Sequence, residues 1–464
     1  MKAGLPEKLI DQIMVRGELY EVGGSVRDAL ISPGSENKDR DFLVTGIPLN
    51  ELTSILTNHG KVDLVGRSFG VMKFAPRGGD VTHDFAIPRK ERSTGLAHRD
   101  FDVTYDHTLP VETDLYRRDF TINAMARRIP SGEIIDPYGG REDIKRRLIR
   151  VVFPGAIGED PLRILRGAQF AARLEFEIET ATLQAMKDAA GLIDTVSPER
   201  IAEEINKMLV RAVRPSIGFR YLLEIGVLEC ILPELTQCVG VEQPGGFHRW
   251  DVFDHTMVCI EAAPQRLHLR LAALFHDVGK PATRELVEGG ATFYGHDKLS
   301  VRMAIKALKR LRYSNDIIEK VSTLVGKHMF SDRAGEKGIR RLIKNVGQDL
   351  IFDLLDLRRA DIVAQGMGQK SSEVDDFESS VRTEIEKKPP FGLKDLDING
   401  NDIMVEFGLK QGPLIGRILN DLLEMVLDNP AANTHEALMS RAREFLAQQT
   451  ESQNHDNEGK DQLW

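Results

Sequence analysis

The stretch from Glu21 to Thr45, EVGGSVRDALISPGSENKDRDFLVT, constrains the fold more than any other part of this sequence. A β-prone run, Leu19–Val22, leads into a Gly-Gly turn, and Ser25 is a suitable N-cap for a helix over Val26–Ile31. Apolar β-forming residues close the stretch and predict a second strand. The order therefore predicts a strand, a tight turn, a helix N-terminus and a further strand.

The turn formed by Gly23 and Gly24 is a candidate phosphate site. Glycines let the backbone approach a ligand closely, and the unpaired N–H groups at a helix start attract anions. Gly24 is therefore a candidate nucleotide contact, which Arg27 could reinforce. A Gly-Gly turn before a helix is more often plain loop chemistry, so this feature alone does not establish a site.

Two aspartates, Asp39 and Asp41, stand one residue apart at the start of the second predicted strand. Side chains two apart on a strand share one face. Two such carboxylates can hold a pair of Mg²⁺ ions roughly 3.5–4 Å apart, the arrangement used for in-line phosphoryl transfer. An isolated pair of this kind is more often a solvated strand end. Together with the glycine turn, it predicts a catalytic metal site.

The motifs GGSVRD and DRD resemble the head of the class II tRNA nucleotidyltransferases, the CCA-adding enzymes, and of their bacterial poly(A) polymerase relatives. The resemblance extends over residues 20–445 and implies that the chain is an enzyme. It implies CTP and ATP as substrates, the tRNA 3′ end as partner, and Mg²⁺ bound by Asp39 and Asp41 as cofactor.

Length and composition agree with a multidomain protein without membrane segments. The chain has 464 residues, more than a single core accommodates. Its three cysteines show no CxxC pairing, and no run is long enough to span a bilayer, so we expect a cytoplasmic protein. The net charge of −9 counts against a nucleic-acid partner, but clusters such as Arg117-Arg118 and Lys145-Arg146-Arg147 allow a basic cleft.

The expected fold class is α+β, with a small α/β nucleotidyltransferase head followed by all-α neck, body, HD and tail helices. The head is expected over residues 1–150, and the neck and body, which select the nucleotide and bind RNA, over 151–243. An HD metal-dependent phosphohydrolase domain is expected over 244–366, a helical tRNA-binding tail over 367–447, and disorder over 448–464. The oligomeric state stays open.

Within the head, helices are predicted in the first 20 residues and over 49–58, and strands over 62–65, 71–74 and 81–87. Asp84 lies on the last of these strands and could join the two aspartates as a third carboxylate. A strand-edge aspartate is the commoner interpretation. Residues 89–107 are charged and aperiodic and predict a mobile loop. In the family, a flexible loop at this place takes part in the switch to ATP, which favours an enzyme able to add A.

The sequence Arg117-Arg118-Asp119, followed by Asn123, resembles the family pattern RRDxxxNAM. Arginines are planar donors suited to triphosphate oxygens, which makes Arg118 a candidate contact. Asp119 and Asn123 are four apart and, on one helical face, could read a ribose hydroxyl. An amphipathic helix with a polar pair would show the same spacing.

Glu159-Asp160-Pro161-Leu162-Arg163 resembles the EDxxR motif of the family. The resemblance implies that Asp160 and Arg163 present fixed donors and acceptors to the base of CTP or ATP, and Arg166 is counted among the nucleotide-binding residues. An Asp–Arg pair at this spacing is more often a surface salt bridge worth less than about 1 kcal/mol. A capped helix beginning at Ser197-Pro198-Glu199-Arg200 resembles the ERxxxE element and is expected to support the site.

The third region shows an H…HD…D order that resembles the HD phosphohydrolases, beyond a break at Gln243-Pro244-Gly245-Gly246. Histidine nitrogens and carboxylate oxygens from several helices can hold a transition metal or Mg²⁺ and activate water on a phosphate ester. We expect His255 to precede a helix and His276-Asp277 to end another. The candidate ligands are His255, His276, Asp277 and Asp361, and His296 and His328 could complete a second metal site.

The C-terminal segment from Phe391 to Arg417 resembles the tail of bacterial CCA-adding enzymes. Gly412-Pro413 would open a helix whose N–H groups lie near Lys410 and Arg417, a candidate phosphate contact for tRNA. An ordinary helix start would look the same.

These features together predict template-independent addition of CCA to tRNA, with release of pyrophosphate, by an enzyme whose HD domain could hydrolyse RNA ends or cyclic phosphates. The alternatives are an enzyme that adds only the final A, one that adds only C residues, and a poly(A) polymerase. From another class, the chain could be chiefly a metal-dependent phosphohydrolase with an RNA-binding head.

Overall fold

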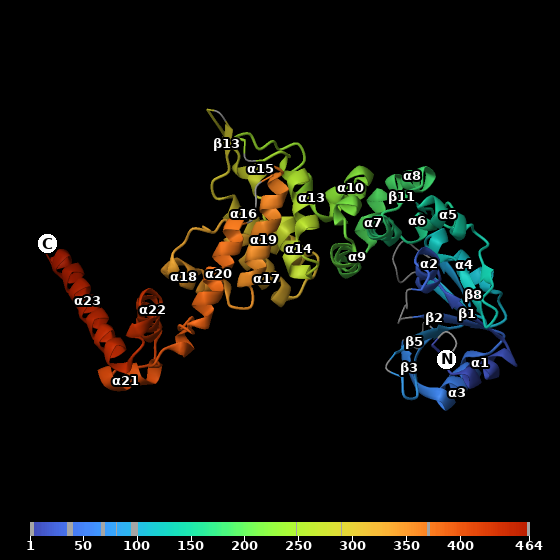
Figure 1. Ribbon diagram of the computed structural model, residues 1–464, viewed down its shortest axis with the longest axis horizontal. Coiled ribbons are helices and arrows are strands. Elements are labelled where there is room, and N and C mark those ends of the chain that lie inside the picture. Colours follow the sequence, from blue (N-terminus) through green and yellow to red (C-terminus); the bar gives the residue numbers. More distant parts are fainter. Residues whose placement is uncertain are drawn as a thin grey trace. The chain divides into compact units, whose positions relative to one another are not determined.

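The computed structural model describes residues 4–34, 40–65, 70–79, 81–93, 101–246, 248–288, 290–368 and 372–461 (Figure 1). The chain separates into two compact units. Unit 1 consists of Met1–Val241, Gln265–Arg270 and Ile305–Asn315, and unit 2 of Glu242–Pro264, Leu271–Ala304 and Asp316–Trp464. The first division falls two residues before the break expected at Gln243.

Unit 1 begins with a seven-stranded sheet in the order β3-β4-β5-β2-β1-β8-β9. β2 and β5 pair in parallel, whereas β1 pairs antiparallel with both β2 and β8. The strands are β1 Glu18–Val22, β2 Asp41–Thr45, β3 Gly60–Val65, β4 Val71–Pro76, β5 His83–Ala86, β8 Ala126–Ile129 and β9 Ile134–Ile135.

Both faces of this sheet are covered. Phe42 and Val44 of β2 join a core with α1 and α3, whereas Leu43 joins a second cluster with Leu115 of α4. Because side chains alternate along a strand, an uninterrupted apolar run is what a strand buried on two faces requires. The covering helices are α1 Glu7–Met14, α2 Gly24–Ile31, α3 Leu49–His59 and α4 Val111–Tyr116. The head is thus the α/β domain expected.

The segment predicted as a mobile loop, 89–107, contains a β-hairpin instead. β6 Arg89–Ser93 pairs antiparallel with β7 Phe101–Tyr105, while residues 94–100 lie outside the described part. Phe101, Val103 and Tyr105 alternate with polar residues, which is the period of a strand. The prediction was wrong for the two strands because their many charged residues hid this alternation.

The rest of unit 1 is mainly helical, with one short pair of parallel strands, β10 and β11. A Cβ on Gly218 would lie 2.4 Å from the Sδ atom of Met208 and 2.9 Å from the carbonyl oxygen of Ala168, so α10 packs closely on α9 and α7. The elements are η1 Thr121–Asn123, α5 Gly140–Arg146, β10 Leu148–Ile149, α6 Ala156–Glu159, α7 Leu162–Leu174, β11 Glu177–Ile178, α8 Thr180–Asp188, η2 Ala190–Thr195, α9 Pro198–Arg211, α10 Pro215–Ile225, α11 Val227–Ile231 and α12 Pro233–Thr236.

Unit 2 is a helical bundle in which α13 packs along α19. A short hairpin, β12 with β13, stands out from it (Figure 1). The elements from here on are α13 Val252–Ala262, α14 Leu267–Phe275, α15 Lys280–Thr283, β12 Glu285–Val287, β13 Gly290–Thr292, α16 His296–Arg310, α17 Asn315–Lys327, α18 Glu336–Val346, α19 Ile351–Gln365 and α20 Ser372–Glu386.

The tail of unit 2 has its own apolar core, which includes Ile418, Leu422 and Leu438. It is joined to the bundle through buried Arg340, which pairs with Glu384 at 2.7 Å and donates to the carbonyl of Leu427 at 2.6 Å. The elements are η3 Leu393–Asp395, α21 Gly400–Phe407, α22 Pro413–Asp428, η4 Pro430–Ala432 and α23 His435–Asp461.

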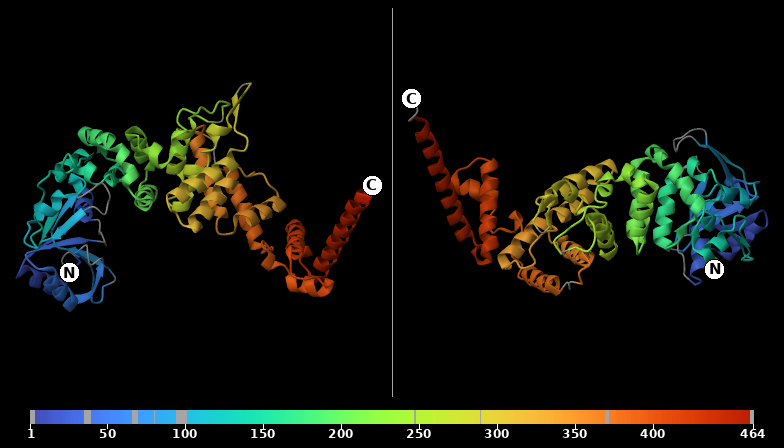
Figure 2. Two further views of the ribbon diagram at one scale, coloured as in Figure 1. Left: turned by 180° about the vertical axis from the view of Figure 1, so that it is seen from behind. Right: turned by 90° about the horizontal axis from the view of Figure 1, so that it is seen from above.

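The disorder expected over 448–464 differs from the structure, in which α23 continues unbroken to Asp461 (Figure 2). The polar residues there include Gln, Glu and Lys, which favour a helix even without an apolar face. None of the described helices has the length and apolar character needed to cross a bilayer.

Candidate functional site

Gly23 is the residue around which the head site assembles. Its φ is +76°, a conformation that side chains with a Cβ rarely adopt. A Cβ at this position would lie 2.6 Å from Nη1 of Arg118 and 3.8 Å from Oδ2 of Asp41. The glycine therefore lets an arginine and a carboxylate from separate elements approach the same turn.

The helix after the turn begins one residue earlier than predicted. α2 starts at Gly24 and has Gly23 as its N-cap, so the assignment of Ser25 as the N-cap was wrong. Ser25 lies in the first helical turn, where its hydroxyl donates to the carbonyl of Val22 at 3.4 Å. The positive φ of Gly23 favours glycine at the N-cap position. Gly24 itself faces Arg27, whose Nη2 would lie 3.4 Å from an added Cβ.

Asp41 and Asp84 lie next to each other on the two parallel strands. They are direct register partners of β2 and β5. Neighbouring strands lie about 4.8 Å apart and register partners point to the same face, so the two carboxylates are side by side. Oxygen ligands of this kind fit Mg²⁺. Asp39 lies outside the described residues.

Asp114 holds the arginine pair, and the sequence analysis missed it. Its side chain is fully buried, and its oxygens accept from Arg117 at 2.6 Å and from Arg118 at 3.2 Å. Burial alone would raise the pKa of Asp114, but the two guanidinium groups lower it. The spacing of three and four residues from Asp114 to the two arginines was the available signal.

Asp119 and Asn123 do meet, but not on an α-helix as predicted. The chain is extended at Phe120, which bridges to Val151, and then forms the 3-10 turn η1. Asn123 Nδ2 donates to Asp119 Oδ1 at 3.0 Å. Burial would raise the pKa of Asp119, but Arg166, 2.6 Å from its other oxygen, and the hydrogen bonds lower it to about 2.

Arg27 and Arg166, both predicted to bind the nucleotide, belong to this same buried network. Nη1 of Arg27 donates to Oδ1 of Asn123 at 2.6 Å. Both guanidinium groups lie over the ring of Phe170, at 5.1 and 5.4 Å from its centroid. Arg27 is almost completely buried, so it links α2 to η1 and α7 rather than projecting from the helix start.

The side chains of Asp160 and Arg163 in the EDxxR motif bind other partners rather than each other. Asp160 pairs with Arg200 of α9 at 3.0 Å. Arg163 is buried and donates to the carbonyls of Ala156 at 3.2 Å and Arg117 at 2.7 Å. The motif on α7 is thus tied to the arginine pair and to α9.

The ERxxxE element supplies two residues that the sequence analysis did not count among the site. Arg200 pairs with Asp160, and buried Glu204 lies 3.7 Å from Arg166. Only their place in the motif could have identified Arg200 and Glu204 as site residues, because their partners Asp160 and Arg166 lie in another part of the chain.

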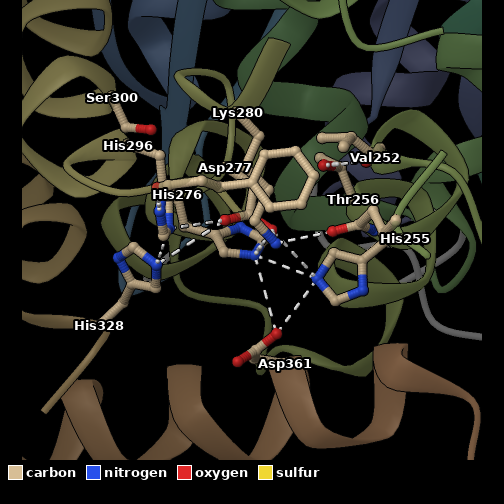
Figure 3. Close-up of polar contacts among 12 residues, drawn as sticks. Val252, His255, Thr256, His276, Asp277, Lys280, His296, Ser300, His328 and Asp361 are labelled. Carbon is tan, nitrogen blue, oxygen red and sulfur yellow. Dashed lines mark hydrogen bonds and ion pairs between the residues drawn. The ribbon is translucent and has the colours of Figure 1, made fainter. Parts of the chain in front are cut away.

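The H…HD…D residues of unit 2 converge on one buried point (Figure 3). Nε2 of His255 lies 3.2 Å from Nε2 of His276 and 3.1 Å from Oδ1 of Asp361. Oδ2 of Asp277 lies 3.2 Å from His276. Nitrogen and carboxylate oxygen atoms facing one point from three segments form a donor set that fits a divalent cation.

One expectation about this cluster was wrong. His255 lies within α13, not before a helix, since Asp251 caps α13 and its side chain accepts from the N–H of Asp254. His276 and Asp277 directly follow α14, as predicted.

His296 and His328 form a second group that shares Asp277. Their Nε2 atoms are 3.2 Å apart, and Oδ1 of Asp277 lies 3.3 Å from His296 and 3.8 Å from His328. Asp277 therefore offers one oxygen to each group. Burial, helped by His276, lowers the pKa of His328 to about 4, which keeps this imidazole neutral and able to bind a cation.

The backbone orients three of these rings. The Nδ1 atoms of His276, His296 and His328 face the carbonyls of Ala273, Phe293 and Val325 at 2.8, 2.8 and 2.6 Å. Because the carbonyls need a proton on Nδ1, the lone pair of Nε2 points into the cluster. This is the tautomer that a metal site requires.

The two tail residues lie near the start of α22. The helix begins at Pro413 after Gly412, and Lys410 and Arg417 are both exposed there. This is the arrangement expected of a helix start flanked by cations.

Comparisons with known proteins agree with this architecture. The family described as "Poly A polymerase head domain" matches residues 19–150, the one described as "Probable RNA and SrmB- binding site of polymerase A" matches 175–238, and one for domain 2 of tRNA nucleotidyltransferase matches 295–442.

Among curated relatives, the multifunctional CCA protein of Cupriavidus taiwanensis is 36% identical over 339 residues, which cover 70% of this chain and 78% of the relative. The A-adding tRNA nucleotidyltransferase of Deinococcus radiodurans is 35% identical over 68% of this chain and 75% of the relative. The crystal structure of the Bacillus stearothermophilus CCA-adding enzyme in complex with CTP covers 97% of this chain and all of its own, with 23% identity and a TM-score of 0.71. At that identity, the structural likeness concerns the fold.

Proposed function

Because the chain belongs to the class II CCA-adding tRNA nucleotidyltransferases, we propose that its head builds the complete CCA end of tRNA from CTP and ATP. The 3′-hydroxyl of tRNA attacks the α-phosphate, a new phosphodiester forms, and pyrophosphate leaves. The relatives named multifunctional CCA proteins, at 36–40% identity, favour full addition over addition of the last A alone.

We propose that Asp41, Asp84 and Asp39 hold divalent cations, with Mg²⁺ as the natural ion. When bound, such ions activate the attacking hydroxyl and stabilise charge on the leaving pyrophosphate. The hydrogen bond of Arg118 to Asp114 and the absence of a side chain on Gly23 support a role for Arg118 in binding the triphosphate. Asp119 and Asn123 are fixed to each other and would read the ribose.

The observation that carries the proposal is the hydrogen bond of Arg163 to the carbonyl of Arg117 at 2.7 Å. This hydrogen bond links the EDxxR motif to the segment that would hold the triphosphate. Asp160 and Arg163 would therefore read the base of the same nucleotide whose phosphate Arg118 would bind. Choice between CTP and ATP would then come from protein side chains. Arg163→Ala should blur this choice more than it slows pyrophosphate release, and unchanged selectivity would refute the role given to Arg163.

The test of the proposed function uses tRNA transcripts that end before CCA, after C and after CC, incubated with Mg²⁺ and CTP or ATP. Stepwise extension to CCA followed by a stop supports the proposal. Addition of A only to the CC-ended transcript would make the protein an A-adding enzyme, and long A tails a poly(A) polymerase. Asp41→Asn serves as the control without transferase activity.

For unit 2 we propose a metal-dependent phosphohydrolase acting on RNA ends or cyclic phosphates. The supporting observation is that Asp277 offers one oxygen to each of two histidine groups. A cation there would supply an activated water, whose oxygen joins phosphorus while the ester P–O bond breaks and the leaving hydroxyl takes the proton.

The ion proposed for this site is a transition metal or Mg²⁺. Hydrolysis of a ribonucleoside 2′,3′-cyclic phosphate after addition of Mn²⁺, Co²⁺, Ni²⁺ or Mg²⁺ tests this, and no hydrolysis with any of them would refute it.

We also propose that Lys410 and Arg417 contact tRNA phosphates. Their exposure near a helix start supports this. Replacing both with Ala should weaken tRNA binding and reduce its salt dependence.

A further inference from the structure

A cavity of about 650 Å³ opens beside the histidine-rich cluster of unit 2. Its volume is in the range of small-molecule sites, about 300–1,000 Å³. Asp277, His296, His328 and Asp361 line one part of it. The cavity therefore gives a ligand access to the cluster.

The polar part of the cavity can hold a phosphate oxygen. Arg358 lines it, and its Nη1 donates to Oδ2 of Asp361 at 3.1 Å. The Nε–H of Arg358 is buried and has no hydrogen-bond partner within the described part of the chain. A buried donor left unpaired is costly, and a phosphate oxygen would satisfy it.

Two other residues that line the cavity carry large apolar groups and are unusually exposed. Tyr294 is 84% exposed and Met329 is 60% exposed, and both line the cavity. Phe293, the next residue, lies under the ammonium group of Lys280 at 5.5 Å. An exposed aromatic ring at the rim of a polar cavity leaves a face free for another ring.

Tyr294 is close to the cluster along the chain. It stands two residues before His296, so the two Cα atoms are at most about 7 Å apart, and both residues line the cavity. A nucleotide whose phosphate reaches the cluster therefore has its base within reach of the segment that carries Tyr294.

We propose that Tyr294 stacks on the nucleobase of the substrate in this cavity and makes the site prefer nucleoside phosphates to phosphate esters without a base. The inference rests on the phosphohydrolase proposed for unit 2. Tyr294 acts as a specificity-determining residue, while Arg358 holds a phosphate oxygen.

The test compares adenosine 2′,3′-cyclic phosphate with the base-free methyl riboside 2,3-cyclic phosphate, hydrolysed by the full chain with its most effective metal ion. Loss of one base–aromatic stack corresponds to roughly 5- to 150-fold in affinity. Tyr294→Ala should raise KM for the adenosine substrate by such a factor, with a much smaller effect on the base-free one. Tyr294→Phe should restore the wild-type KM. Leu286→Ala, on the hairpin that precedes Tyr294 and 74% exposed, is the matched control and should change neither.

Equal losses on both substrates, or no loss on either, would overturn the role of Tyr294. If the wild-type protein hydrolyses neither substrate, the proposed hydrolase fails, and calorimetric binding of AMP in the presence of the metal then decides. Binding that weakens in Tyr294→Ala but not in Tyr294→Phe supports the stacking role. No binding of AMP by the wild-type protein overturns it.

Discussion

At Gly23 the absence of a side chain leaves room for the guanidinium group of Arg118. Gly23→Ala would add backbone strain of about 1–2 kcal/mol and place a methyl group 2.6 Å from Arg118. We expect kcat/KM to fall by at least about tenfold for CTP and ATP alike, because the change affects the triphosphate and not the base.

Gly34→Ala is the matched control for this change, since Gly34 also has a positive φ, of +95°, but no atom of the described residues lies within 4 Å of an added Cβ. Gly34→Ala should add a similar backbone strain but leave kcat/KM for CTP and ATP unchanged. If both variants lose activity equally, backbone strain and not the position of Arg118 is responsible.

Asp119 gives the head a pH dependence that can be measured. Its pKa in the folded protein, about 2, is below the ordinary value of 3.8. A carboxyl group with a lowered pKa stabilises the fold above its unfolded pKa and loses that contribution as the pH falls. We therefore expect the unfolding free energy of the wild-type protein to decrease relative to Asp119→Asn between about pH 4 and pH 2.

Denaturant unfolding of unit 1 at several pH values checks this prediction for Asp119. Parallel stability curves for the two proteins over this interval would contradict it. The Asn variant keeps the size of the side chain, so the comparison isolates the charge.

At the scale of helices, α9 contacts the segment between α6 and α7, and we expect this contact to affect nucleotide selection. Arg200 of α9 holds Asp160 at 3.0 Å. Arg200→Ala should release Asp160 and reduce the discrimination between CTP and ATP in the same direction as Asp160→Ala, by about tenfold or less. Misincorporation during single-nucleotide addition measures this.

Lys187→Ala is the control for the change at Arg200, because it removes a surface ion pair with Glu224 that involves neither Asp160 nor Arg200. An unchanged error rate in Arg200→Ala would show that Asp160 keeps its position without α9.

The sequence predicted elements well wherever the pattern was local. The strand at Leu19–Val22 and the helix over 49–58 followed from residue types that act over a few positions. The hairpin β6–β7 and the cap at Gly23 did not, because a charged strand and a glycine with positive φ depend on what packs against them.

Contacts between distant segments could not be predicted from the sequence either. Nothing in the spacing of Asp160 and Arg163 indicates that each takes a partner from elsewhere.

The candidate metal ligands of unit 2 also show that local sequence patterns do not predict contacts between distant segments. The order of His255, His276-Asp277 and Asp361 sufficed to name the cluster. The sequence does not show that Asp277 gives one oxygen to each of two histidine groups. This arrangement depends on how α16 and the end of α17 pack beside Asp277. Periodicity on one helix cannot predict how three helices converge.

At the scale of the whole molecule, the two candidate sites lie in separate units. His328→Asn should therefore reduce metal-dependent hydrolysis by at least about 100-fold while tRNA extension stays within about twofold. Both activities are measured on the same preparation. Loss of both would indicate that the units depend on each other or that the variant is misfolded, and circular dichroism separates these outcomes.

We propose that one head site adds C, C and A in order and then stops. The most direct measurement is the sequence of the 3′ ends formed when the wild-type protein receives tRNA without CCA together with CTP, ATP and Mg²⁺. We expect that nearly all extended molecules end in CCA and that Asp41→Asn extends none. Ends carrying only A, ends with long A tails, or full extension by Asp41→Asn would contradict it.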